Sequence, residues 1–215
     1  MLFENVNKIL MIQKITIEGY KSIKEQTVEL FPINILIGGN GIGKSNFISA
    51  FTLIHNLYER NLQNYVLTKG GSDSLLYMGK KETDHLSFDL FFAERGKDAH
   101  NRFIVNMKEA QDSLFIERID TAYHNGVSWH KQLHEVNKQE SSFKNDHTGQ
   151  AFYVNSFLRE FEVYHFHDTG DRSPMKGKCN MDDNVSLKNN GANIAAFLYL
   201  SLIHISEPTR RYAIS

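Results

Sequence analysis

Residues 34–51 read Asn-Ile-Leu-Ile-Gly-Gly-Asn-Gly-Ile-Gly-Lys-Ser-Asn-Phe-Ile-Ser-Ala-Phe, and this stretch decides the fold. It contains Gly-x-x-x-x-Gly-Lys-Ser at residues 38–45, the full pattern of a phosphate-binding loop, or P-loop. Residues 33–37 form an apolar run of strand length, and after the loop apolar residues recur at helical spacing. A strand, a glycine loop and a helix in this order are the context that a P-loop requires.

The residue types of this loop suit a triphosphate. Glycine has no Cβ, so the backbone can take positive φ angles and wrap around an anion with its N–H groups inward. The following helix adds unpaired N–H donors and the positive end of its dipole. Lys44 supplies charge to the β- and γ-phosphates, and the Ser45 hydroxyl ligates Mg²⁺. The alternative is a glycine-rich turn that only starts a helix. We therefore predict a site for a nucleoside triphosphate and Mg²⁺ made by Gly38, Gly39, Asn40, Gly41, Ile42, Gly43, Lys44, Ser45 and Asn46.

Composition sets the outer limits of the function. The chain has 215 residues, 41% of them hydrophobic, and a net charge of −1, so it can bury a core but has no general attraction to nucleic acid or anionic membranes. The single cysteine, Cys179, excludes an intramolecular disulfide and fits a reducing cytoplasm. No stretch reaches the ~18 uninterrupted apolar residues of a membrane span. The N-terminus lacks the pattern of a signal peptide.

Two short strands are expected before the P-loop. Ile15 and Ile17 alternate with polar neighbours, as in a half-buried strand, and residues 27–30 form a second strand. Residues 1–10 look detachable, either as an extension upstream of a true start at Met11 or as an ordinary flexible terminus.

The order of these segments resembles the N-terminus of RecF/SMC-type ATPases, whose ABC-like heads are often described simply as AAA family ATPases. The resemblance rests on Ile-Thr-Ile-Glu-Gly-Tyr-Lys-Ser-Ile at residues 15–23 and on the Asn-Gly-x-Gly-Lys-Ser-Asn form of the loop within residues 33–46. It implies an α/β P-loop NTPase fold of the ABC type, in which a mixed or antiparallel sheet surrounds the P-loop helix. It also implies that the nucleotide is ATP, with Tyr20, Lys21 and Ser22 beside its adenine and ribose; the alternative there is a plain turn.

The rest of the chain predicts more strands and two helices. Apolar residues recur at strand spacing in three segments, which we expect to form an antiparallel meander: residues 85–92, 102–107 and 113–119. Residues 61–81 look like a connecting segment, and residues 123–146 like one more hairpin with a surface loop. We expect an amphipathic helix at residues 150–161 and another that opens at residues 190–193.

Residues 162–168 predict a strand that ends on polar groups and leads into a long loop. His165 and His167 share one face because strand side chains alternate, and Asp168 follows. A metal site would need more ligands than these. The resemblance allows His167 or Asp168 to replace the glutamine that ABC-like heads place near Mg²⁺ and the attacking water. We favour a solvated strand end.

The end of the sequence points to an incomplete domain. Residues 200–210, Leu-Ser-Leu-Ile-His-Ile-Ser-Glu-Pro-Thr-Arg, resemble a translated sequencing adapter, so residues 200–215 are expected to be non-native. A P-loop ATPase also needs an apolar strand ending in Asp, whereas residues 113–120 and 161–168 are interrupted by charge or histidine. A Leu-Ser-Gly-Gly-like signature loop is missing too. We therefore expect a partial ATPase head at residues 11–199 that lacks its hydrolytic acid.

Other classes of P-loop protein fit less well. A GTPase needs Asn-Lys-x-Asp, whereas residues 137–140 read Asn-Lys-Gln-Glu, and two strands precede the P-loop here. Nothing resembles the arginine-rich lid of a small-molecule kinase. A non-enzymatic alternative is a nucleotide-gated interaction module that binds ATP without turnover.

These observations together predict a function for the full-length protein. By the resemblance, two heads form a homodimer that clamps ATP between the P-loop of one and the signature loop of the other, and hydrolysis reopens it. DNA or an effector protein is the expected further partner, in DNA repair, chromosome maintenance or anti-phage defence. The 215-residue chain itself is expected to bind nucleotide without turnover.

Overall fold

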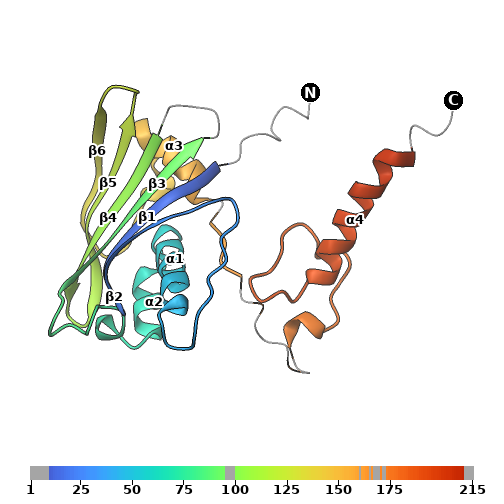
Figure 1. The fold of residues 1–215 in the computed structure, drawn as a ribbon, viewed down its shortest axis with the longest axis horizontal. Helices are drawn as coiled ribbons and strands as arrows, with labels where there is room; N and C mark the ends of the chain where they lie inside the picture. Colours follow the sequence, from blue (N-terminus) through green and yellow to red (C-terminus); the bar gives the residue numbers. More distant parts are fainter. Residues whose placement is uncertain are drawn as a thin grey trace. The chain divides into compact units, whose positions relative to one another are not determined.

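The computed structural model describes residues 10–94, 100–159, 161–164, 166, 170 and 173–210 (Figure 1). The chain divides into two compact units, residues 1–161 and residues 162–215. The larger unit contains the P-loop segment and all six strands of the described residues. Each unit is described by itself.

One six-stranded antiparallel sheet forms the frame of the larger unit, in the order β2-β1-β3-β4-β5-β6 (Figure 1). The predicted antiparallel meander is thus confirmed, and it continues one strand further than the three predicted segments. The strands are β1 (Leu10–Tyr20), β2 (Ile23–Glu29), β3 (His85–Glu94), β4 (His100–Ala110), β5 (Ser113–His124) and β6 (Trp129–Lys138).

Three helices pack against the sheet and share one hydrophobic core with it. Strand β4 shows the cause, because Phe103, Val105 and Met107 are fully buried and alternate with neighbours that are only partly buried. The helices contribute apolar side chains to the same core, among them Leu53 and Val154. Their bounds are α1 (Lys44–Tyr58), α2 (Leu62–Thr68) and α3 (Gly149–Leu158).

The strand predicted before the P-loop is not formed. Residues 33–37 have neither helical nor strand structure, although their backbone leads into the loop as expected. The side chains of Ile33, Ile35 and Ile37 are 82%, 78% and 88% exposed. A strand exists only when its backbone pairs with a neighbour, and among the described residues none pairs with this run. The sequence therefore identified an apolar run, but it does not show whether a neighbouring strand is available to pair with that run.

Helix α2 lies within residues 61–81, where we expected only a connection. Its first N–H groups are satisfied from a distant part of the chain. The Glu140 carboxylate accepts hydrogen bonds from the amides of Leu62 (2.9 Å) and Gln63 (2.8 Å). This cap stabilises a seven-residue helix that local propensity alone does not predict. It also gives the acidic end of Asn-Lys-Gln-Glu a structural role.

The smaller unit contains a 3₁₀ turn, η3 (Pro174–Lys176), and the helix α4 (Ile194–Arg210). The predicted helix is confirmed at its start, where buried Asn193 donates to the carbonyls of Asp183 and Ser186, both at 2.8 Å. None of the described helices has the length and apolar character that crossing a membrane requires.

The strand predicted at residues 162–168 is wrong for residues 162–164 and 166, which the structure shows without strand pairing. His165, His167 and Asp168 lie outside the described residues. Within the described part of the chain, no group of three or more His, Cys, Asp or Glu side chains could hold a metal ion.

Candidate nucleotide-binding site

The P-loop depends on glycine at the point where it enters helix α1. Gly41 and Gly43 have φ angles of +84° and +99°, a region that other residues rarely adopt. Gly43 is the residue that precedes the first helical residue, and a Cβ on it would come within 3.3 Å of Ser22 Oγ. A side chain at this position would therefore strain the backbone and crowd the turn between β1 and β2.

The backbone of the loop offers unpaired hydrogen-bond donors. The amide N–H groups of residues 39–46 donate to no other described residue. Helix α1 is 15 residues long and carries no acidic residue in its first turn. Its N-terminus therefore combines free donors with the positive end of the helix dipole, which favours an anion.

The Lys44 side chain folds back onto the start of the loop. Its Nζ donates to the carbonyl oxygens of Gly38 and Gly39, both at 2.6 Å. The Ile42 side chain lies over Gly38, where a Cβ would come 2.0 Å from Ile42 Cδ1. The ammonium group is thus held at the loop by two neutral carbonyls, which are weaker partners than an anionic phosphate oxygen.

Ser45 and Asn46, the last two residues of the loop, differ in their hydrogen bonds. Ser45 is exposed, and its hydroxyl has no hydrogen-bond partner among the described residues. Asn46 Nδ2 donates to Ser22 Oγ at 2.8 Å, which ties the start of α1 to the turn between β1 and β2. Ser22 thus lies against the loop, and its implied place beside the adenine and ribose stays a prediction.

Tyr20 is buried, which differs from its implied place beside an adenine. It is fully buried, its ring packs edge-on against Phe88 at 5.6 Å between centroids, and its hydroxyl lies 3.0 Å from Ser49 Oγ. Burial raises the pKa of its phenol. Tyr20 therefore has no ring surface to offer a base, whereas Lys21 keeps a partly exposed side chain.

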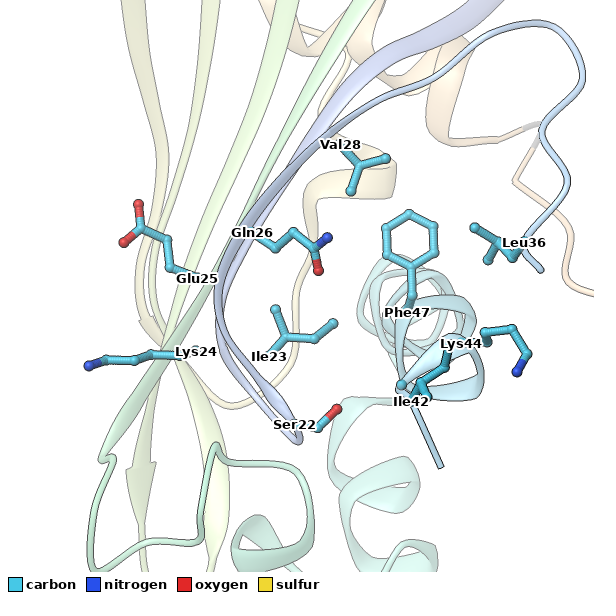
Figure 2. A pocket seen from close by; sticks show the side chains of 11 residues that line it. Ser22, Ile23, Lys24, Glu25, Gln26, Val28, Leu36, Ile42, Lys44 and Phe47 are labelled. Carbon is cyan, nitrogen blue, oxygen red and sulfur yellow. The ribbon is translucent and has the colours of Figure 1, made fainter. Parts of the chain in front are cut away.

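A pocket of about 360 Å³ adjoins the loop (Figure 2). Gln26, Val28 and Leu36 line it together with Phe47 of α1. Figure 2 shows these side chains turned toward the space between β2 and α1, whereas Lys24 and Glu25 extend away from Lys44. Sequence reasoning missed this pocket, because its walls come from segments that only the fold brings together.

These groups fit a magnesium-bound triphosphate. The free N–H groups and the Lys44 ammonium can bind phosphate oxygens, and the free Ser45 hydroxyl can ligate Mg²⁺. A glycine loop, a lysine and a serine at the start of a helix are the groups from which a P-loop site is built.

Comparison with known families makes the class more specific. The sequence profile of the AAA ATPase domain family matches residues 11–195, and the chain belongs to this family. This confirms the prediction of an ATP-binding ATPase domain of the AAA type; the assignment to the RecF/SMC type stays a prediction. A comparison with curated protein sequences gives no match.

Proposed function

We propose that this chain binds ATP and Mg²⁺ through residues 38–46 and is part of an ATPase head of the ABC type. The observation that carries the proposal is the set of unpaired N–H groups at the start of α1, next to an ammonium group held only by two loop carbonyls. Both features favour a polyanion over any neutral ligand.

Each residue has a distinct part in this proposal. Lys44 exchanges its two carbonyl partners for phosphate oxygens, and the amides of the loop bind further oxygens. Ser45 ligates Mg²⁺, which supplies the charge that neutralises the phosphates. Asn46, through Ser22, holds the loop at a fixed distance from the β1–β2 turn.

At the level of the whole protein, we propose that two such heads dimerise around ATP in the cytoplasm. The two paired strands that precede the loop, β1 and β2, support an ABC-type head. DNA or an effector protein would then respond to dimer closure. We propose that the acid for hydrolysis comes from outside this chain.

Isothermal titration calorimetry with Mg²⁺ and ATP tests the site. The Lys44→Ala variant should lose detectable ATP binding, because the ammonium group is the principal charge of the loop. Lys108→Ala is the matched control, since Lys108 is an exposed lysine on β4, away from the pocket of Figure 2. Unchanged binding by Lys44→Ala would contradict the assignment of the loop.

A nucleotide-gated interaction module without turnover is the second candidate. It is favoured by the side chains at the pocket, where the only carboxylate of the lining, Glu25, extends away from Lys44 (Figure 2). Phosphate-release kinetics separate the candidates: the full-length protein should turn ATP over if it is an ATPase, and bind without release if it is a module. Steady release by the 215-residue chain would contradict our placement of the acid outside it.

A further inference from the structure

Strand β6 forms one edge of the sheet (Figure 1). It pairs with β5 only, so one side of its backbone has no strand partner among the described residues. The pairing with β5 is regular over residues 129–133 and shifts beyond them. We name this regular stretch the β6 edge. Its unpaired backbone groups are a template to which another extended chain can be added.

Alternate residues of the β6 edge lie on the outer face of the sheet, away from the helices. Lys131 is aligned, across β5, with Arg102 of β4. Because Arg102 is the neighbour of the inward-facing core residue Phe103, Arg102 and Lys131 point outward. Trp129 and Leu133 share this face by the same alternation, and they are 40% and 49% exposed.

The ring of Trp129 is held in place by neighbours on the same face. Its centroid lies 5.9 Å from that of Phe91 and 5.1 Å from that of His124, and the Arg102 guanidinium lies 5.3 Å from it. Phe91 in turn lies 5.1 Å from His100. We name these four rings the outer aromatic cluster. The cluster ends at the β6 edge, so an apolar side chain added beside Trp129 would meet a preformed surface.

The charge of Lys131 is not compensated. Two carboxylates of the outer face are already bound, Asp89 by Arg102 and Asp120 by Arg118. Lys131 is exposed and forms no ion pair within the described part of the chain. An acidic side chain directly opposite Lys131 would therefore stabilise an added strand.

A second copy of the β6 edge is a poor occupant of this site. Antiparallel pairing of two copies in the register that places Trp129 opposite Leu133 also places Lys131 opposite itself. Like charges directly opposite each other destabilise a strand pair. Lys131 thus disfavours self-association through this edge and favours a partner whose central residue is acidic.

We propose that the β6 edge binds an extended segment of a partner protein, which becomes a seventh strand of the sheet. Backbone hydrogen bonds to β6 supply the affinity, and three outward side chains of the segment supply the specificity. An acidic residue lies opposite Lys131, and apolar residues lie opposite Trp129 and Leu133. The residues between them face His130 and Gln132 and are polar. The segment therefore has the pattern apolar–polar–acidic–polar–apolar.

The first probe is the peptide Thr-Val-Thr-Glu-Thr-Val-Thr, which presents Val, Glu and Val on one face and reads the same in both directions. Added to the 215-residue chain, it should shift the amide NMR signals of residues 129–133. Lys131→Glu should weaken its binding about five-fold, because a favourable cross-strand pair becomes a repulsive one. Lys108→Glu makes the same charge change at an exposed lysine of the interior strand β4 and should not weaken it.

Two further peptides test the charge and the backbone separately. Thr-Val-Thr-Lys-Thr-Val-Thr should bind Lys131→Glu more tightly than the wild type, because the charges of the pair are exchanged. A version of the first peptide with N-methylated backbone amides should not bind, because it lacks the donors that strand pairing requires. Circular dichroism should show that both variants keep their fold.

Three results would overturn the proposal: equal binding of the first peptide by Lys131→Glu and the wild type, retained binding of the N-methylated peptide, and no shift of the signals of residues 129–133. A dimer in analytical ultracentrifugation whose amides at residues 129–133 resist hydrogen exchange would assign the edge to a second copy, and would also overturn it. None of these results would bear on ATP binding at Lys44.

Discussion

The sheet and the P-loop segment contain the same kinds of apolar residue in opposite environments. Phe88 and Phe103 on the strands are fully buried, whereas Ile35 and Ile37 before the P-loop are 78% and 88% exposed. On the strands, each backbone pairs with a neighbour and the inward side chains share one core with the helices. Residues 33–37 have no such neighbour among the described residues. An apolar pattern therefore indicates that the side chains of a segment favour burial. A strand forms only where a neighbouring strand is available to pair with its backbone.

This difference assigns separate tasks to the two regions. Burying an isoleucine side chain is worth about 1.5–3 kcal/mol, and this gain is not realised at Ile33, Ile35 or Ile37. The core of the larger unit must therefore supply the stability of that unit without them. The segment before the P-loop instead positions glycines and Lys44 for ligand binding. Substitutions in the two regions should have unequal effects on folding.

The largest expected effect is on the core. Phe88→Ala should lower the free energy of unfolding by about 3–5 kcal/mol, because it removes a fully buried ring and leaves a cavity beside Tyr20. Phe31→Ala is the matched control, since Phe31 is 66% exposed at the start of the P-loop segment and should change the value little. Urea denaturation measures both. Equal losses would show that the P-loop segment also contributes to the core.

A smaller effect is expected at the hydrogen-bonded pair of His134 and Asp146. His134 is almost completely buried, and its Nδ1 lies 2.7 Å from Asp146 Oδ2. Burial raises the pKa of the Asp146 carboxyl, but hydrogen bonds from Thr148 and His134 outweigh it, so that the net pKa is lowered from its ordinary 3.8. Stability from Asp146 is thus present above this ordinary value and is lost as the pH falls through the lower, folded-state pKa.

Asp146→Asn tests this dependence. At pH 7 the variant should be less stable than the wild type by about 1.5–3 kcal/mol, the usual value of hydrogen bonds to a charged group. The difference should shrink as the pH falls below 3.8, because the wild-type carboxyl then becomes protonated too. Unfolding free energies between pH 7 and pH 3 measure it. A difference that stayed constant over this range would contradict the role of the charge.

The elements that could be predicted from the sequence are those with local causes. The alternation of Phe103, Val105 and Met107 specifies a strand, and the glycines of the P-loop specify where α1 begins. The nine loop residues could also be named, since their chemistry depends on residue type and spacing. That assignment stays a prediction until a nucleotide is bound.

Features with distant causes could not be predicted. Helix α2 depends on Glu140, which is 78 residues beyond Leu62. Tyr20 follows a glycine and looks like a turn residue, but the fold buries it against Phe88. The outer aromatic cluster joins strands that only the register of the sheet brings together. None of these long-range contacts can be recognised from the residues within a short stretch of sequence.

The distant cap of α2 should have a moderate effect. Glu140→Ala should destabilise the chain by about 1 kcal/mol, the usual value of a helix cap, because two amides of α2 lose their acceptor. Glu117→Ala is the control, since Glu117 is exposed on β5. Thermal unfolding measures both. If Glu140→Ala unfolds like the control, the amides of α2 find an equivalent acceptor in water.

The smallest expected effect is at the exposed run itself. Ile35→Ser should change the free energy of unfolding by less than about 0.5 kcal/mol, because the side chain it replaces already lies in water. The variant should nevertheless self-associate less than the wild type in analytical ultracentrifugation, because an apolar run without strand partners is a template for pairing with another chain. Ile17→Ser, at a fully buried position on β1, gives the contrast in stability. A loss of stability on Ile35→Ser as large as that of Ile17→Ser would mean that residues 33–37 are already part of the core, and the distinction between the two regions would fail.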